Sequence, residues 1–221
     1  MSKTRENARR IVLTPAAVSP PQAGGSAQIA TGFRAIARVP VKHRLAKKWC
    51  RGMPTPLVLD ACCGPRSFWF DKKDKRALFV DRRRGIAPGV WGGVTYKVGG
   101  WIVDPDVVAD FTKLPFEDSV FHLVVMDPPH EVRENATGCI GCKYESLRGK
   151  WREMIQSGFS ECFRVLKSGG VLVFKWNEIS VPLSEILKLT PEKPLFGHRS
   201  GKSSKTHWVC FLKNPAATAR Q

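Results

Sequence analysis

The segment 121–131, FHLVVMDPPHE, joins an apolar run to residues that can do chemistry. Asp127 ends the run, and Pro128, Pro129 and His130 follow it. The proline ring restricts φ to a narrow range and leaves no N–H to donate. The Asp127 carboxylate and the Pro128 carbonyl are therefore two hydrogen-bond acceptors held in fixed directions, with no competing donor from the next two residues.

Three further apolar runs also end in an aspartate. They are PLVLDAC (56–62) with Asp60, ALFVD (77–81) with Asp81, and DVVAD (106–110) with Asp110. In open α/β sheets ligands bind outside the carboxyl ends of the strands. Any one aspartate can instead cap the following turn, but four at equivalent positions favour a ligand site. We expect these carboxylates to face a solvent-filled crevice rather than the core.

Strands and helices alternate from residue 57 onward. GGVLVFKW (169–176) is a fifth predicted strand and THWVCFLK (206–213) a last one. The intervening segment 144–167 predicts a helix, because apolar residues recur at helical spacing: Leu147, Trp151, Ile155, Cys162 and Leu166. Leu183, Ile186 and Leu187 predict a second, short helix. Near-continuous apolar strands separated by crossovers indicate an α/β fold with a mostly parallel sheet covered on both faces.

The loop after the first strand, LDACCGPRSFWFD, narrows the class of ligand. Gly64 allows a tight turn and a close backbone approach, but Pro65 and Arg66 replace the pattern G-x-G-x-x-G of a dinucleotide site. The run GHRSGKSSK (197–205) lacks the first glycine and the strand-to-helix setting of a phosphate-binding loop. An acid at the end of the second strand, here Asp81, suits both hydroxyls of a ribose. These features favour a cofactor that contains adenosine.

Several of these runs, taken in order, resemble a known family. LDACCG, FVD, ADFTKLPF and MDPPH, in this order, look like the class I S-adenosylmethionine-dependent methyltransferases over about residues 56–213. More narrowly, the runs DPDVVADFTKLPF, VVMDPPH, RVLKSGGVLVFKWNE and PLFGHRSGKSSKTHW resemble small phage- and mobile-element-type methyltransferases. The resemblance implies a Rossmann-like methyltransferase sandwich whose sheet is mostly parallel, with an antiparallel C-terminal strand.

The resemblance implies S-adenosylmethionine as the cofactor and assigns residues to it. Asp81 is expected to bind the ribose, and Asp110 and Phe111 the adenine. The floor under the methionine part of the cofactor is expected from Asp60, Ala61, Cys62 and Gly64. The second glycine usual in the family is absent. Arg66, close to that place, is expected either to pair with the methionine carboxylate or to have a structural role against Asp71 or Asp74.

The Asp-Pro-Pro-aromatic signature that MDPPH resembles belongs to methyltransferases acting on planar amino nitrogens. It implies catalytic roles for Asp127, Pro128, Pro129 and His130, with the two acceptors aimed at the N–H protons of the amine. The aromatic position carries His130, which can stack, hydrogen bond or carry charge. We expect an enzyme that methylates an exocyclic amino group of a nucleic-acid base, adenine being favoured. The alternatives are a protein amide or small amine as substrate, or a catalytically silent accessory protein that binds the cofactor.

The net charge of +17 is unevenly distributed. Residues 1–55 hold 11 Lys and Arg and one acid, residues 56–163 hold 15 of each sign, and residues 164–221 hold 10 Lys and Arg and three acids. Two basic flanks around a neutral centre favour a polyanionic partner, in particular RNA or DNA. We expect a disordered Pro/Ala-rich tail (1–30), a basic helical extension (31–55), a methyltransferase domain (56–213) and a flexible tail (214–221).

Polar residues near the expected site are candidates for contacting the substrate. Lys175, Trp176 and Asn177 end the fifth strand and are expected to point toward the crevice. His198, Lys202 and His207 belong to a basic and aromatic C-terminal segment whose composition suits phosphates and stacked bases; a solvated hairpin is the alternative.

Cysteine usage and hydropathy limit the remaining possibilities. The seven cysteines include an adjacent pair and do not form a recognisable disulfide framework. Cys139 and Cys142 form one CxxC pair, but a structural zinc site needs four ligands, so no metal is expected. No run approaches the ~18 apolar residues of a membrane helix. We expect a cytoplasmic protein.

Overall fold

The computed structural model describes residues 56–91, 94–132, 146–147, 149–200 and 203–214. All of them belong to one compact unit, Gly32–Gln221. The predicted N-terminal tail and basic helical extension lie outside the described residues, as does the C-terminal tail after Asn214.

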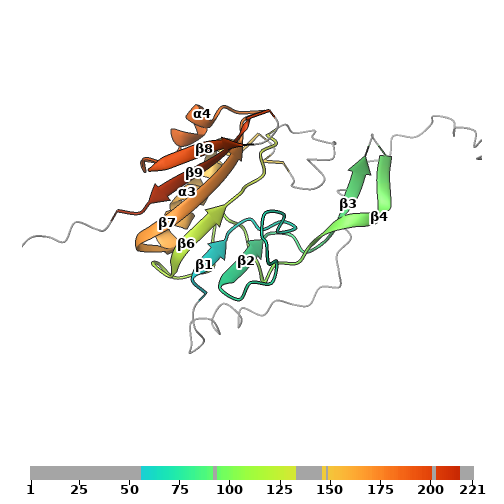
Figure 1. The fold of residues 1–221 in the computed structure, drawn as a ribbon, viewed down its shortest axis with the longest axis horizontal. Coiled ribbons are helices and arrows are strands. Elements are labelled where there is room, and N and C mark those ends of the chain that lie inside the picture. The colour runs from blue at the N-terminus through green and yellow to red at the C-terminus, as the bar shows by residue number, and fades with distance from the viewer. Residues whose placement is uncertain (1–55, 92–93, 133–145, 148, 201–202, 215–221) are drawn as a thin grey trace, which may run out of the picture. The chain divides into compact units, whose positions relative to one another are not determined.

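A seven-stranded sheet in the order β5-β2-β1-β6-β7-β9-β8 forms the centre of this unit (Figure 1). Its strands are β1 (Val58–Asp60), β2 (Ala77–Asp81), β5 (Val107–Val108), β6 (Phe121–Met126), β7 (Leu166–Asn177), β8 (Phe196–Ser200) and β9 (Thr206–Leu212). The five strands from β5 to β7 pair in parallel, whereas β9 is antiparallel to both β7 and β8. The predicted Rossmann-like α/β fold with an antiparallel C-terminal strand is confirmed.

The order of the strands creates a switch point in the middle of the sheet. From β1 the chain builds outward to β2 and β5, then returns to place β6 on the other side of β1. Neighbouring connections therefore leave in opposite directions between β1 and β6, which opens a crevice at their carboxyl ends. All four strand-end aspartates of the sequence lie at or just beyond this edge of the sheet.

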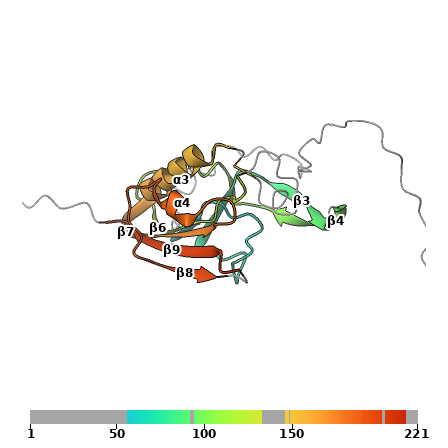
Figure 2. The ribbon, with the colours of Figure 1, turned by 90° about the horizontal axis from the view of Figure 1, so that it is seen from above.

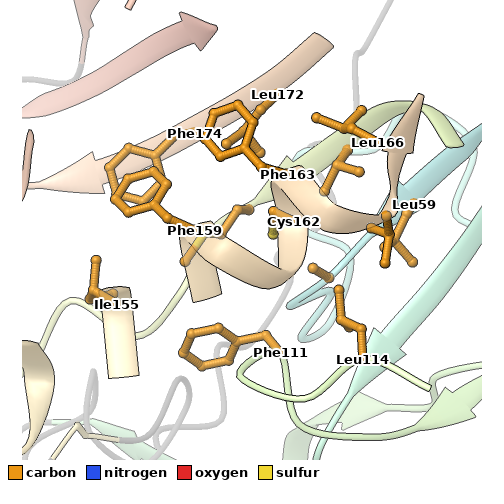
Figure 3. Close-up of a cluster of buried hydrophobic side chains, with 14 of the residues drawn as sticks. Leu59, Phe111, Leu114, Ile155, Phe159, Cys162, Phe163, Leu166, Leu172 and Phe174 are labelled. Atoms are coloured by element: carbon orange, nitrogen blue, oxygen red, sulfur yellow. The ribbon is translucent and has the colours of Figure 1, made fainter. Parts of the chain in front are cut away.

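Helix α3 (Trp151–Val165) covers one face of the sheet against β6 and β7. The predicted helix is longer than α3, because Leu147 precedes the helix and Leu166 begins β7. The buried residues of α3 recur at helical spacing and include Ile155, Phe159 and Cys162. Figure 3 shows these side chains among Leu172 and Phe174 of β7. The short helix α4 (Leu183–Leu187), also predicted, lies on the same side as α3 (Figure 2) and adds Ile186 to this core.

The opposite face is covered differently from what the sequence predicts. In the described part of the chain both helices lie on one face, and at β1 and β2 the other face is covered by the loop after β1. There Trp69 packs edge-on against Phe79, with ring centroids 4.8 Å apart, over a small cluster with Cys63 and Ala77. A loop can contribute to such a face because one aromatic ring buries a large apolar surface.

Two elements were not predicted. Strands β3 (Gly85–Trp91) and β4 (Val94–Val103) form a separate antiparallel sheet, and its register shifts between Ala87 and Gly89. Pro88 lies at that shift, and a proline within a run argues against a strand when only the sequence is read. Edge strand β8 has no apolar alternation, because nearly all its residues are exposed.

Gly158 tests the packing of α3. A Cβ at this position would lie 2.6 Å from the Phe111 ring and 2.6 Å from the Met126 methyl carbon. We expect Gly158→Ala to lower the free energy of unfolding by about 1–3 kcal/mol, because the ring must move in a close-packed core. Urea unfolding measures this change. Ser157→Ala, at an exposed position of the same helix, is the control and is expected to stay within about 0.5 kcal/mol of the wild type. Equal stability of the two variants would contradict the packing described.

Candidate active site

A cleft at the switch point gathers most of the predicted site. Its lining comes from the carboxyl ends of four strands: Ala61, Cys62 and Gly64 after β1, Asp81, Arg82 and Arg83 at the end of β2, Phe111 after β5, and Asp127 and Pro129 after β6. Five of the eight predicted cofactor residues and two of the four predicted catalytic residues thus line a single cavity.

The turn at Gly64 ties the first two strands together. Its φ is +48°, a backbone conformation that strains any residue with a side chain. In this conformation the Gly64 N–H donates to Asp81 Oδ2 at 3.0 Å, and the Cys63 N–H donates to the Val80 carbonyl at 2.8 Å. The loop after β1 is therefore fixed against the end of β2, as the sequence predicts for a glycine that allows close approach.

Arg82 and Arg83 also line the cleft and are additional to the residues predicted from the sequence. Asp81 Oδ1 accepts hydrogen bonds from the Arg83 backbone N–H at 2.9 Å and from Arg83 Nε at 3.1 Å. Arg82 Nη1 lies 3.8 Å from Asp110 Oδ2, beyond hydrogen-bond distance but within reach of a charge interaction. The run of three arginines directly after a strand-end acid was a sequence signal that could have found these residues.

Asp110 caps a turn, while its neighbour Phe111 enters the cleft. Asp110 Oδ1 accepts from the Thr112 backbone N–H at 2.9 Å and from the Thr112 hydroxyl at 2.7 Å. This is the turn-capping alternative that the sequence left open for each aspartate. Phe111 is buried, and its ring forms the part of the cleft wall that rests on α3 at Gly158.

Two of the strand-end carboxylates are buried, and the expectation that all four face a solvent-filled crevice is wrong for Asp60, which does not line the cleft. Asp60 has no exposed surface and Asp81 is 5% exposed. Asp60 accepts a hydrogen bond from Trp69 Nε1 at 2.7 Å and one from the Cys62 N–H at 3.3 Å. Burial nevertheless dominates and raises the pKa of Asp60 to about 7. The loop that covers the sheet face separates Asp60 from water, whereas Asp81 lines the cleft with little exposed surface.

Arg66 makes its contacts outside the cleft. Its guanidinium lies 3.7 Å from the centre of the Phe79 ring and donates to the Lys72 and Asp104 carbonyls, the latter at 2.7 Å. Its nearest carboxylate is that of Asp106, at 3.8 Å. These contacts favour the structural role over pairing with a methionine carboxylate, with acceptors other than the predicted Asp71 and Asp74.

Asp127 is the centre of a charged cluster. Lys175 Nζ donates to its Oδ2 at 2.6 Å, and His130 Nε2 lies 3.0 Å from its Oδ1. Burial raises the pKa of Asp127, but the hydrogen bond and charge of His130 and the charge of Lys175 outweigh it and hold the pKa below its usual value. Asp127 is therefore an ionised carboxylate at the edge of the cleft, able to accept further N–H donors.

The ring of His130 packs perpendicular to that of Trp176. The two rings meet at 85°, with centroids 5.2 Å apart. The imidazole is 19% exposed and lies between Trp176 and the Asp127 carboxylate. Of the roles open to His130 from the sequence, the structure favours a polar contact with the Asp127 carboxylate.

The predicted substrate residues divide between the two faces of the sheet. Lys175 reaches Asp127, but Trp176 is fully buried and donates to the Val181 carbonyl at 2.8 Å, so its predicted place in the crevice is wrong. Successive residues of a strand point to opposite faces, which explains the division. Asn177 is engaged locally: its Nδ2 donates to Thr206 Oγ1 at 3.1 Å, and its Oδ1 caps Ile179.

The C-terminal candidates lie away from the cleft. His207 is buried, with Nε2 3.0 Å from Glu178 Oε1, and with His198 it lines a second, open pocket between α4 and β8. His198 is exposed on β8, in the hairpin that the sequence left as an alternative. Lys202, Cys139 and Cys142 lie outside the described residues. Within the described residues, no cluster of three or more His, Cys, Asp or Glu side chains could hold a metal ion, and no helix is long and apolar enough to cross a membrane.

Comparison with known proteins gives distant structural likenesses. No family model matches the chain, and a search of curated proteins finds no match. Among solved structures, the PH0226 protein from Pyrococcus horikoshii OT3 is 16% identical, with a TM-score of 0.42, over 72% of this chain and 81% of the other. The 1,6-didemethyltoxoflavin-N1-methyltransferase of Burkholderia thailandensis, solved with 1,6-didemethyltoxoflavin and S-adenosylhomocysteine, is 13% identical, with a TM-score of 0.42, over 71% and 70%. A SAM-dependent methyltransferase from Aquifex aeolicus is 12% identical, with a TM-score of 0.39, over 77% and 88%. These values are too low to transfer an activity, so the function rests on the site itself.

The buried Asp60 makes stability depend on pH. Its pKa is about 7 in the folded protein against an ordinary value of 3.8, so between pH ~4 and ~7 the unfolded chain loses this proton first. The free energy of unfolding therefore falls as pH rises through that window, and the loss is complete above it. Asp60→Asn keeps an acceptor for Trp69 but cannot ionise. Urea unfolding at pH 5 and pH 8 measures the effect. Between these pH values we expect the free energy of unfolding to fall further in the wild type than in this variant, by on the order of 2–3 kcal/mol.

Asp71→Asn, at an exposed carboxylate, is the control. We expect the free energy of unfolding of this variant to depend on pH as it does in the wild type. If Asp60→Asn also kept the wild-type dependence between pH 5 and pH 8, the raised pKa of Asp60 would be wrong.

Proposed function

We propose that the protein is an S-adenosylmethionine-dependent N-methyltransferase. The observation that carries the proposal is that one cleft joins Gly64, Asp81 and Phe111 to Asp127 and Pro129. The first three are residues that the family resemblance assigns to the cofactor, and the last two belong to the motif that it assigns to methyl transfer. They come from segments that are far apart in the sequence, so chance proximity along the chain does not explain their meeting.

The residues of the cleft fit the parts of this cofactor. A carboxylate at the end of β2 suits the ribose hydroxyls, which would share Asp81 with Arg83. The Phe111 ring offers a flat apolar wall for an adenine. Gly64 has no side chain within the cleft, so a ligand can approach the backbone of the loop after β1. When bound, the cofactor would supply an electrophilic methyl group on its sulfonium.

The contribution of the chain to the reaction is orientation and electrostatics. An amine attached to an aromatic ring is a poor nucleophile, because its lone pair is delocalised into the ring. The Asp127 carboxylate and the Pro128 carbonyl accept its two N–H groups, which favours a lone pair directed out of the ring plane. Lys175 and His130 keep Asp127 ionised and aimed, so the acceptor needs no reorganisation during the reaction.

We propose an exocyclic amino group of a nucleic-acid base as the substrate, with adenine favoured. The support is the family resemblance of MDPPH, including that to phage-type methyltransferases, and the basic flanks of residues 1–55 and 164–221 around a neutral centre. Such flanks give sequence-independent affinity for phosphates. A protein amide or a small amine would use the same two acceptors, and a silent accessory protein would bind the cofactor without turnover.

Methyl transfer from labelled S-adenosylmethionine tests the proposal. DNA, total RNA and a protein extract are incubated in parallel, and labelled products are digested to nucleosides or amino acids. Label in N6-methyladenosine, its deoxy form or N4-methylcytosine is the expected result. Label in protein would move the substrate to the amide alternative, and cofactor binding without label in any product would support the accessory role.

Asp127→Ala separates chemistry from cofactor binding. We expect kcat to fall by about 100-fold or more, because one of two aimed acceptors is lost, while the Kd for S-adenosylhomocysteine changes little. Calorimetry gives the Kd, and Asp127→Asn serves as a second variant that retains an acceptor without the charge. Glu117→Ala, at an exposed acid, is the matched control. An unchanged kcat in Asp127→Ala would exclude the proposed role.

Lys175→Met tests whether Lys175 positions the Asp127 carboxylate and keeps it ionised. Without the ammonium group the pKa of Asp127 is expected to rise, so the acidic limb of the kcat/KM profile moves to higher pH. Lys175→Arg, which keeps the charge, is expected to restore the profile in part. Lys193→Met, at an exposed lysine, should leave it unchanged. A lower kcat with an unshifted profile would instead mean that Lys175 acts only through packing.

A further inference from the structure

A row of side chains crosses the sheet next to Asp127, on the face opposite α3. Lys175 of β7 is in register with Trp208 of β9, and Trp208 with His198 of β8. Partners in register share a face, and Phe174, one residue before Lys175, packs against Phe159 of α3. Because Lys175 also binds Asp127, this row begins at the proposed catalytic carboxylate.

Phe68 completes an aromatic platform on this row. Its ring meets that of Trp208 at 85°, with centroids 5.6 Å apart. Lys175 Nζ lies almost equally far from both rings, 5.9 Å from Phe68 and 5.7 Å from Trp208. These distances are within the range of cation–π attraction. We call Phe68, Trp208 and the Lys175 ammonium beside them the Phe68–Trp208 platform.

The platform is held rigidly from behind. Phe68 adjoins Trp69, with ring centroids 6.1 Å apart, and Trp69 is anchored by Phe79 and by its hydrogen bond to the buried Asp60. Trp208 is fixed by strand pairing on both sides. Both Phe68 and Trp208 remain partly exposed. Aromatic rings fixed in this way offer contact surface to a ligand without a large loss of side-chain entropy.

The charge around the platform decides which flat ligand suits it. The Lys175 ammonium is already paired with Asp127, so it does not attract a second carboxylate. Exposed His198 of β8 is in register with Trp208 and shares its face, and exposed Lys205 directly precedes β9, within the C-terminal segment that carries a net positive charge. Rings with neighbouring cations form the pattern that binds single-stranded nucleic acids, because every base has a face to stack and every linkage a phosphate.

We propose that the Phe68–Trp208 platform stacks one base of a single-stranded nucleic acid, next to the base whose amino group meets Asp127. Its part in methyl transfer rests on the proposed function, whereas the binding itself does not. A base in a duplex is already stacked on its neighbours, so the platform favours a single strand, a loop or an unpaired end. The ring that stacks on nucleic acid is then supplied by Trp208, not by His130.

Binding of a fluorescein-labelled 12-nucleotide RNA, and of its DNA counterpart, to the full chain tests the proposal. Anisotropy is measured with saturating S-adenosylhomocysteine over a series of salt concentrations. We expect Trp208→Ala to weaken binding about tenfold or more, with an unchanged slope of log Kd against log salt, because stacking releases no counterions. Lys205→Ala is expected to reduce the slope by about one unit, as loss of a phosphate contact does.

Matched variants separate stacking from general damage. Phe70→Ala removes a fully exposed ring close to Phe68 in the sequence and should leave the Kd unchanged, whereas Trp208→Phe should retain most of the affinity. Addition of the oligonucleotide should quench tryptophan fluorescence in the wild type and less so in Trp208→Phe. Thermal unfolding of each variant identifies any loss of fold.

The outcomes are distinct from those of the methyl-transfer experiment. Wild-type affinity in folded Trp208→Ala, or no binding of either oligonucleotide by the wild type, overturns the platform even if methyl transfer to another amine is found. Loss of binding in Trp208→Ala supports the platform even if no transfer to nucleic acid is detected, in which case the proposed function fails and the binding site remains.

Discussion

The pairing of β1 with β6 is the constraint on which the rest of the structure depends. The strands β2 to β5 lie between them in the sequence, yet Val58, Leu59 and Asp60 pair in parallel with Leu123, Val124 and Val125. The Ala61 N–H continues the pairing with a hydrogen bond to the Val125 carbonyl at 2.9 Å. This register sets the end of β1 beside the end of β6, so that the cleft, the loop after β1 and the Asp-Pro-Pro segment share one edge.

The same pairing brings together two carboxylates with opposite behaviour. Asp60 is buried under the loop after β1, and its pKa is raised to about 7, chiefly by burial and in part by the nearby charge of Asp127. Asp127 is paired with Lys175 and His130, and its pKa is lowered. A low-dielectric site cannot stabilise two neighbouring anions equally. Asp127 is therefore ionised at neutral pH, whereas Asp60 is still partly protonated there.

The sequence was sufficient for the fold and for most of the cleft. Apolar runs ending in aspartate predicted β1, β2, β5 and β6, because buried parallel strands need little besides hydrophobic residues and a polar end. Helical spacing predicted α3 and α4. Contacts that depend on side-chain direction were harder to predict. Trp176 was expected to contact the substrate at the end of its strand, but the strand register directs its side chain into the core. Arg66 was a candidate ligand for an anion, but its guanidinium instead contacts the Phe79 ring and the Asp104 carbonyl. The platform was missed because Phe68 follows the first strand of the sheet and Trp208 lies in its last, so no local pattern joins them.

The absent side chain at Gly158 has a consequence for how this protein can diverge. Phe111 and Met126 both occupy the space that a larger residue on α3 would take, and Phe111 is also a wall of the cleft. Mutational changes at positions 111, 126 and 158 are therefore epistatic. A larger residue at 158 becomes tolerable only after the ring at 111 has shrunk or shifted, which reshapes the cleft. In an alignment of homologues, these three positions would then covary. Selection on the shape of the cleft would thus act on position 158, although Gly158 does not line the cleft.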